Sequence, residues 1–187
     1  WFNNSFDNLP PLTHAAIAHH YFVTIHPFED GNGRIARALA IKSLSKSINK
    51  PLLTSLSAII QNNKKAYYKI LANSNHTNEV TEWINYFAKT LMASQNYTKK
   101  LLNFLIFKMQ LYQRLAGNLN DRQEKVLKRI FKAGIDSFKS GLSAENYISI
   151  TKTSRATATR DLQDLVTKGA LQKTGRLKSS RYYLTFS

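Results

Sequence analysis

The sequence contains no cysteine, which excludes a disulfide framework and a metal bound by cysteine. It has no run of about 18 apolar residues, so we expect no membrane span. No secretory signal pattern opens the chain, and we expect a cytoplasmic protein. The chain begins at Trp1 rather than methionine, so we expect a fragment whose N-terminal part is missing.

Acidic residues are scarce, because 27 lysines and arginines face only 11 aspartates and glutamates, giving a net charge of +16. This excess predicts attraction to nucleic acid, nucleotides or acidic protein surfaces. Residues 1–117 carry 13 basic and 5 acidic side chains, and residues 118–187 carry 14 and 6, so each part has a charge of +8. The charge therefore does not assign binding to one part.

Residues 26–37, HPFEDGNGRIAR, combine a glycine loop with the start of a helix. The two glycines around Asn32 reach positive φ without steric cost, and residues 34–41 contain no helix breaker. A helix start offers free N–H groups and a positive dipole end to phosphate. The segment therefore predicts a polyphosphate site.

The side chains of this segment suit the same purpose. Arg34 and Arg37 share a helix face, and a guanidinium group binds phosphate oxygens at two points. Asp30 can offer a hard oxygen ligand to Mg²⁺, and His26 can accept a proton from a hydroxyl group near neutral pH. Phe28, apolar between polar neighbours, is expected to point into the core and to pin the loop.

Simpler interpretations exist for each of these residues. The glycine loop can be a plain turn, and Glu29 with Arg34 or Arg37 can be a weak surface ion pair. A zinc site is a further alternative, with the ligands His19, His20, His26 and Asp30. The zinc site lacks a recognised ligand spacing and leaves the glycines and arginines unexplained.

Residues 26–37 resemble the signature of the Fic family, H-x-F-x-D/E-G-N-G-R-x-x-R, at every defined position. Residues 15–25 resemble the family's buried helix before the motif. Asn63 with Tyr67 and Tyr68, and then residues 83–87, resemble its later helices. The resemblance covers roughly residues 1–115 and implies a helical catalytic bundle, which we assign to residues 1–117.

The resemblance implies a protein adenylyltransferase, which moves AMP from Mg-ATP to a hydroxyl side chain of a target protein and releases pyrophosphate. His26 would be the base and Asp30 the Mg²⁺ ligand. The residues around the phosphates would be Gly31, Asn32, Gly33, Arg34 and Arg37. The intact Gly33 favours nucleotidyl transfer over phosphoryl transfer. Tyr67 or Tyr68 would lie near the adenine, although two helical tyrosines also suit a core.

Many relatives carry an inhibitory helix, S/T-x-x-x-E-G/N, whose glutamate pairs with the second motif arginine. Residues 140–146 end correctly, but Gly141 occupies the hydroxyl position. We expect this helix to lie upstream or on a partner protein. The flap that positions the target should also lie upstream, so we expect the fragment to bind Mg-ATP and to transfer AMP weakly.

Helical spacing of apolar residues continues beyond the motif. One predicted core stripe consists of Val80, Trp83, Ile84, Phe87 and Leu91. A second consists of Leu101, Leu102, Leu105, Met109 and Tyr112. Residues 117–120 break the pattern, and we place a domain boundary between residues 117 and 118.

Residues 118–187 predict a winged helix-turn-helix domain. Asn120 and Gln123 form a capping box for a helix over 121–132. Ser143 can cap a helix through residue 150, and Ser154 can cap a helix over 155–168. Residues 170–173 and 181–186 are predicted strands. The fold class is therefore mainly α, a Fic-type helical bundle followed by three helices and a β-hairpin.

Residues 157–162 resemble the recognition helices of winged-helix regulators of bacteria. Side chains expected to face a major groove are Arg155, Thr157, Thr159, Arg160 and Gln163. Side chains expected to reach phosphates are Lys173, Arg176, Lys178 and Arg181. Such a domain can instead serve only for packing or protein docking. The alternative function is a DNA-binding regulator whose Fic-like domain senses nucleotide without transferring it.

Overall fold

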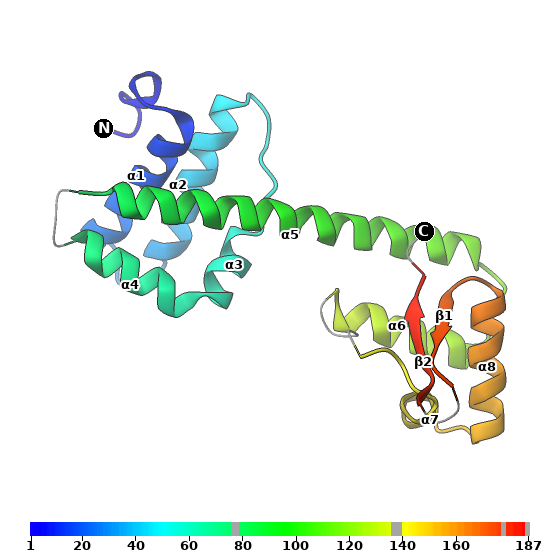
Figure 1. The fold of residues 1–187 in the computed structure, drawn as a ribbon. Helices are drawn as coiled ribbons and strands as arrows, with labels where there is room; N and C mark the ends of the chain where they lie inside the picture. Colours follow the sequence, from blue (N-terminus) through cyan, green and yellow to red (C-terminus); the bar gives the residue numbers. More distant parts are fainter. Residues whose placement is uncertain (76–78, 136–139, 177–178, 186–187) are drawn as a thin grey trace. The chain divides into compact units, whose positions relative to one another are not determined.

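The computed structural model describes residues 1–75, 79–135, 140–176 and 179–185, which are mainly helical, as predicted. They form two compact units, Trp1–Lys99 and Lys100–Ser187, and each is described by itself. The first contains η1 (Phe6–Asn8), α1 (Pro11–Ile25), α2 (Asn32–Ser47), α3 (Leu56–Asn62), α4 (Lys64–Asn75) and the first part of α5 (Thr81–Arg114) (Figure 1). The second contains the rest of α5, then α6 (Asp121–Ala133), α7 (Ala144–Thr151), α8 (Arg155–Thr167), β1 (Leu171–Thr174) and β2 (Arg181–Leu184).

The first unit packs its helices around Trp83 on α5. This side chain is fully buried, and its indole N–H donates to the carbonyl of Ala16 on α1 over 2.8 Å. Phe87 and Leu91, one and two turns later, are also buried. The first predicted stripe therefore does face a core. Among the described residues, no helix combines the length and apolar character needed to cross a membrane.

Helix α1, which precedes the motif, begins with a proline and is held to α2 by a buried hydrogen bond. Pro11 occupies the first turn of α1, where its missing N–H costs nothing. His14 is buried on α1, and its Nδ1 lies 2.8 Å from the hydroxyl of Ser43 on α2. This contact holds together the two helices that the motif connects.

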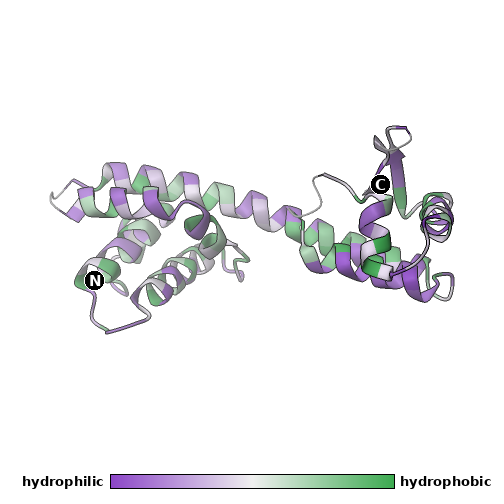
Figure 2. Cartoon of the chain, turned by 90° about the horizontal axis from the view of Figure 1, so that it is seen from below, coloured by the Kyte–Doolittle hydropathy of each residue, from purple (hydrophilic) through white to green (hydrophobic). Residues whose placement is uncertain are grey.

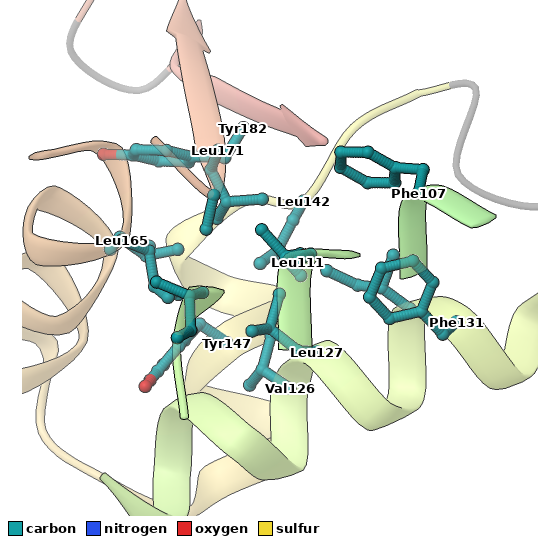
Figure 3. Close-up of a cluster of buried hydrophobic side chains, with 14 of the residues drawn as sticks. Phe107, Leu111, Val126, Leu127, Phe131, Leu142, Tyr147, Leu165, Leu171 and Tyr182 are labelled. Atoms are coloured by element: carbon teal, nitrogen blue, oxygen red, sulfur yellow. The ribbon is translucent and has the colours of Figure 1, made fainter. Parts of the chain in front are cut away.

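In the second unit, apolar side chains from four helices and the hairpin converge on one core. Figure 3 shows Leu111 of α5 beside Leu127 of α6, and Phe107 beside Phe131, with Leu165 and Tyr182 on the opposite side of the cluster. β1 and β2 pair antiparallel, with Leu171 opposite Leu184, and Leu142 adds an isolated antiparallel bridge to Tyr182. The predicted second strand extended to Phe186, which lies outside the described residues.

The second predicted stripe on α5 is wrong at three of its five positions, whereas Tyr112 does pack against the core of the second unit. Leu102, Leu105 and Met109 are 41%, 49% and 55% exposed, whereas Phe104 and Phe107 are buried. The reason is that apolar residues are not confined to the buried side of α5, since Ile106 is also exposed. Figure 2 shows hydrophobic and hydrophilic colours mixed along this helix. Periodicity alone then fits more than one stripe and does not identify the one that packs.

The two compact units divide within α5, between Lys99 and Lys100, whereas the domain boundary predicted from the break in sequence pattern lies between Gly117 and Asn118. The last turns of α5 bury Phe104, Phe107 and Leu111 in the core of the second unit. Packing therefore assigns the end of this helix to the unit that follows it.

A buried carboxylate, Asp161 of α8, ties the helices of the second unit together. It accepts hydrogen bonds from Arg122 Nε over 2.7 Å, from the Tyr147 hydroxyl over 2.9 Å and from the Asn120 amide over 3.1 Å. Burial alone would raise the pKa of Asp161, but the hydrogen bonds from Arg122, Tyr147 and Asn120 outweigh burial and hold this pKa below its usual value.

Candidate active site

The motif forms the connection between α1 and α2. Gly31 precedes α2 and has a φ of 89°, a left-handed conformation that glycine adopts without strain. α2 begins at Asn32, so the predicted helix is confirmed and starts slightly earlier. Its first turn contains no acidic residue. The free N–H groups and the positive end of the helix dipole therefore remain uncompensated within the helix.

Asn32, and not Phe28, pins the loop. The Asn32 side chain is buried, accepts a hydrogen bond from the Phe28 N–H over 3.1 Å and donates one to the Phe28 carbonyl. Phe28 is 52% exposed, so the expectation that it points into the core is wrong. The physical reason is that an amide can satisfy both backbone groups of the loop, which an apolar ring cannot do.

His26 ends α1 in an unusual backbone conformation. Its φ is 50°, which is uncommon for any residue other than glycine, and its side chain is exposed. Its Nδ1 lies 3.2 Å from the carbonyl oxygen of Val23. Since a carbonyl can only accept, Nδ1 carries the proton when this bond forms, and in the neutral ring Nε2 then keeps a lone pair. The arrangement suits a general base.

Asp30 and Arg34 form an ion pair over 2.9 Å, with side chains that are 91% and 73% exposed. The expected surface ion pair is thus present, but its acid is Asp30 rather than Glu29. An exposed pair of this kind contributes little to stability. One carboxylate beside the predicted phosphate site would suit Mg²⁺, which proteins commonly hold by one or two carboxylates together with substrate phosphates.

The predicted residues line a hollow of about 360 Å³. Its walls are His26, Glu29, Asp30, Gly31, Asn32, Gly33, Arg34, Arg37, Gln61, Lys64 and Tyr68. A second hollow of about 420 Å³ is lined by Gly33, Arg37, Ser57, Ala58, Ile60, Gln61, Lys64, Tyr67 and Tyr68. The wall from Gly33 and Arg37 to Tyr68 is common to both hollows. The structure therefore brings His26, Asp30, the glycine loop and both arginines to one hollow.

The two tyrosines differ in environment. Tyr67 is buried and packs edge-on to Trp83, whereas Tyr68 is 55% exposed. Burial, with a smaller effect of the neighbouring Tyr68, raises the pKa of Tyr67 to about 12, so the phenol stays neutral. Tyr67 thus has a core position and still lines the second hollow, while Tyr68 offers an exposed ring.

Arg37 is half-buried and forms no ion pair with any carboxylate that the structure describes. A Cβ added to Gly33 would lie only 3.3 Å from its guanidinium, so the glycine leaves room for this group. Burial, together with the charges of Arg37 and His20, lowers the pKa of His19 to about 3. His19 is therefore neutral, and the charge of Arg37 remains available to an anion.

The zinc alternative finds no support. Within the described ranges, no group of three or more histidine, cysteine, aspartate or glutamate side chains could hold a metal ion. His19 instead stacks on Trp83, with ring centroids 5.2 Å apart. It is part of the aromatic core.

Gln61 and Lys64 also line both hollows, although neither was predicted from the sequence. One signal was available for the lysine. Lys64 and Lys65 open α4, a helix with no acidic residue in its first turn, just before the two tyrosines. Nothing in the local sequence marked Gln61.

In the second unit, most of the predicted DNA-facing side chains of α8 are exposed, namely Arg155, Thr159, Arg160 and Gln163. Thr157 is half-buried, and its N–H donates to the hydroxyl of Ser154, which caps the helix as predicted. Arg155 pairs with Glu145 of α7 over 3.1 Å.

On the hairpin, Arg176 is exposed and Arg181 is half-buried, whereas Lys178 lies outside the described residues. The Arg181 guanidinium donates to the carbonyl of Ser180 over 2.9 Å. A hollow of about 320 Å³ is lined by Ala144, Glu145, Arg155, Thr159, Lys173, Ser180 and Tyr182. Helix α8 and the hairpin therefore present basic side chains to one hollow.

Residues 1–44 match the model of the Fic/DOC family, which confirms the resemblance for this part of the chain. The protein adenylyltransferase Fic of Drosophila willistoni is 36% identical over 76 residues, which are 40% of this chain and 14% of that protein. The protein adenylyltransferase fic-1 of Caenorhabditis elegans is 34% identical over 95 residues, 50% of this chain and 18% of that protein. A protein adenylyltransferase Fic of Nematostella vectensis is 33% identical over 81 residues, 43% and 18% of the two chains. The chain thus matches less than a fifth of the length of each.

Proposed function

We propose that this chain, whose residues 1–44 carry the Fic/DOC match, is a protein adenylyltransferase that transfers AMP from ATP to a hydroxyl side chain of another protein. The names of its relatives support AMP transfer at the level of the family. The observation that carries the proposal is the hollow in which His26, Asp30 and the start of α2 meet. Each of these groups has a separate task in nucleotidyl transfer.

The reaction requires a base beside the phosphates. His26 Nε2 takes the proton from the target hydroxyl. The hydroxyl oxygen of the target then attacks the α-phosphorus of ATP. The bond from the α-phosphorus to the oxygen of the β-phosphate breaks, and pyrophosphate leaves. The hydrogen-bond distance of 3.2 Å between Nδ1 and Val23 favours the tautomer that this step needs.

The phosphates would lie against the first turn of α2, where N–H groups and the helix dipole attract them. Arg34 and Arg37 would contact the outer phosphates, and Gly31 and Gly33 would let the backbone approach them. Asp30 would hold Mg²⁺, which when bound would supply positive charge for the triphosphate. The nucleobase would lie toward Tyr67 and Tyr68 in the adjoining hollow.

The position of the label distinguishes nucleotidyl transfer from phosphoryl transfer. The full chain is incubated with target lysate and with ATP labelled either at the α-phosphate or at the γ-phosphate. Protein labelled from α-ATP alone supports the proposal. Label from γ-ATP alone would establish a kinase-like reaction instead.

We also propose that residues 118–187 form a winged helix that contacts DNA. The order of elements supports it, since α6 is followed by the bridge at Leu142, by α7 and α8, and by the hairpin. The exposed basic side chains of α8 also support it.

Arg160→Gln should weaken DNA binding and flatten its salt dependence, measured by fluorescence anisotropy. Lys125→Gln, an equal charge loss at an exposed position of α6, is the control and should change little.

A further inference from the structure

Helix α4 begins with two exposed lysines that differ in position. Lys64 lines both hollows, whereas Lys65 lines neither. We infer that Lys64 is a phosphate-binding residue that acts with Arg37 to select nucleoside triphosphates over monophosphates. This inference rests on the proposed function, since it deepens the description of the same site.

The 360 Å³ hollow is lined by more basic than acidic side chains. Its cations are Arg34, Arg37 and Lys64, and its acids are Glu29 and Asp30. Arg34 is paired with Asp30 over 2.9 Å, so its charge is partly offset before a ligand binds. Neither Arg37 nor Lys64 forms an ion pair with any described carboxylate. Both cations therefore remain available to a ligand.

Lys64 lies close to Tyr68 and at the start of α4. Its Nζ lies 5.8 Å from the centre of the Tyr68 ring, so the amine sits beside another residue of the shared wall. Lys64 is also the first residue of α4, where the positive end of the helix dipole disfavours a cation. A bound anion would remove this unfavourable interaction.

The two available cations favour a ligand that carries several phosphates. Lys64 and Arg37 both belong to the wall shared by the two hollows, and they come from different helices, α4 and α2. Two separate cations interact best with a chain of several phosphates, because each can neutralise a different group. A monophosphate presents fewer charges and gains less from the second cation.

The test is calorimetric titration of the full chain with ATP, AMP and inorganic tripolyphosphate. Lys64→Gln should weaken the binding of ATP and tripolyphosphate by roughly ten-fold and that of AMP clearly less. Lys65→Gln removes the same charge one residue along the helix and should stay within about two-fold of wild type. Lys64→Arg should retain most of the affinity, because it keeps the charge.

Equal affinities of Lys64→Gln and Lys65→Gln for ATP and tripolyphosphate would overturn the inference, as would an equal loss of AMP and ATP binding. Circular dichroism of both variants excludes a folding defect as the cause of a loss. Selective loss of triphosphate binding by a chain that never transfers AMP would sustain the inference and refute the proposed function. AMP transfer with no effect of Lys64→Gln on binding would sustain the proposed function and refute the inference.

Discussion

Gly33 lies at a position where helix stability and ligand binding make opposite demands. As a glycine inside α2 it lowers helix propensity relative to alanine. As the neighbour of Arg37 it leaves room for the guanidinium, which would be 3.3 Å from an added Cβ. The site therefore carries a local cost in stability that its geometry explains.

Gly33→Ala should separate these two effects. We expect the free energy of unfolding to rise by up to about 1 kcal/mol, since alanine favours the helix. We expect ATP affinity to fall several-fold, because the methyl group shifts the Arg37 guanidinium by a few tenths of an ångström. Urea denaturation and ATP titration measure the two quantities on one sample. Unchanged ATP affinity would mean that the position of Arg37 does not matter.

At the scale of elements, local sequence signals predicted the caps of α6, α7 and α8, because a cap depends on residues within one turn. They did not predict what the caps touch. Asn120 caps α6 and also donates to Asp161, 41 residues later. Ser154 caps α8 through contacts with Thr157. Two caps that look alike in sequence therefore differ in the packing that depends on them.

The cost of removing each cap should reflect this difference. Ser154→Ala should cost about 1 kcal/mol of stability, as expected for an exposed cap. Asn120→Ala should cost about 2 to 3 kcal/mol, because it also removes a donor from the buried Asp161. Chemical denaturation followed by far-ultraviolet circular dichroism measures both. Equal costs would show that the bond between Asn120 and Asp161 contributes nothing.

The motif itself was the most predictable part of the site, since its loop, helix start and polar groups are consecutive in the sequence. The loop contact of Asn32 and the exposure of Phe28 were not predictable in this way, because both depend on how the loop folds back. Lys64 was missed for a related reason, as its position in the same hollows as Arg37 arises from the packing of α4. The apolar faces of α5 show the same limit for a helix.

At the scale of the whole molecule, the two units should respond differently to acid. His19 belongs to the first unit and has a pKa lowered to about 3, against about 6.5 in the unfolded chain. The unfolded chain therefore binds this proton more readily, and the stability that neutral His19 contributes is complete above about pH 6.5 and declines as pH falls toward 3. Asp161 has a lowered pKa in the second unit, so its contribution is complete above about pH 4 and declines only below that.

The first unit should therefore lose stability from about pH 6.5 downward, on the order of 5 kcal/mol over the whole range, while the second resists until about pH 4. Both tryptophans, Trp1 and Trp83, lie in the first unit, so their fluorescence reports its unfolding alone. Amide hydrogen exchange in α6 and α8 reports the second unit. His19→Asn should flatten the first profile and leave the second unchanged. Parallel profiles for His19→Asn and wild type would contradict this assignment.

The central claim is that His26 is the base of an AMP transferase, and one paired measurement tests it most directly. Wild type and His26→Asn are compared for ATP binding and for transfer of α-labelled AMP to protein in a lysate. Asparagine is the matched replacement, because it tolerates the left-handed backbone at φ 50°. The predicted result is equal ATP binding, label with wild type and no label with the variant. Undiminished labelling by His26→Asn, or tight ATP binding without transfer by either protein, would contradict the claim.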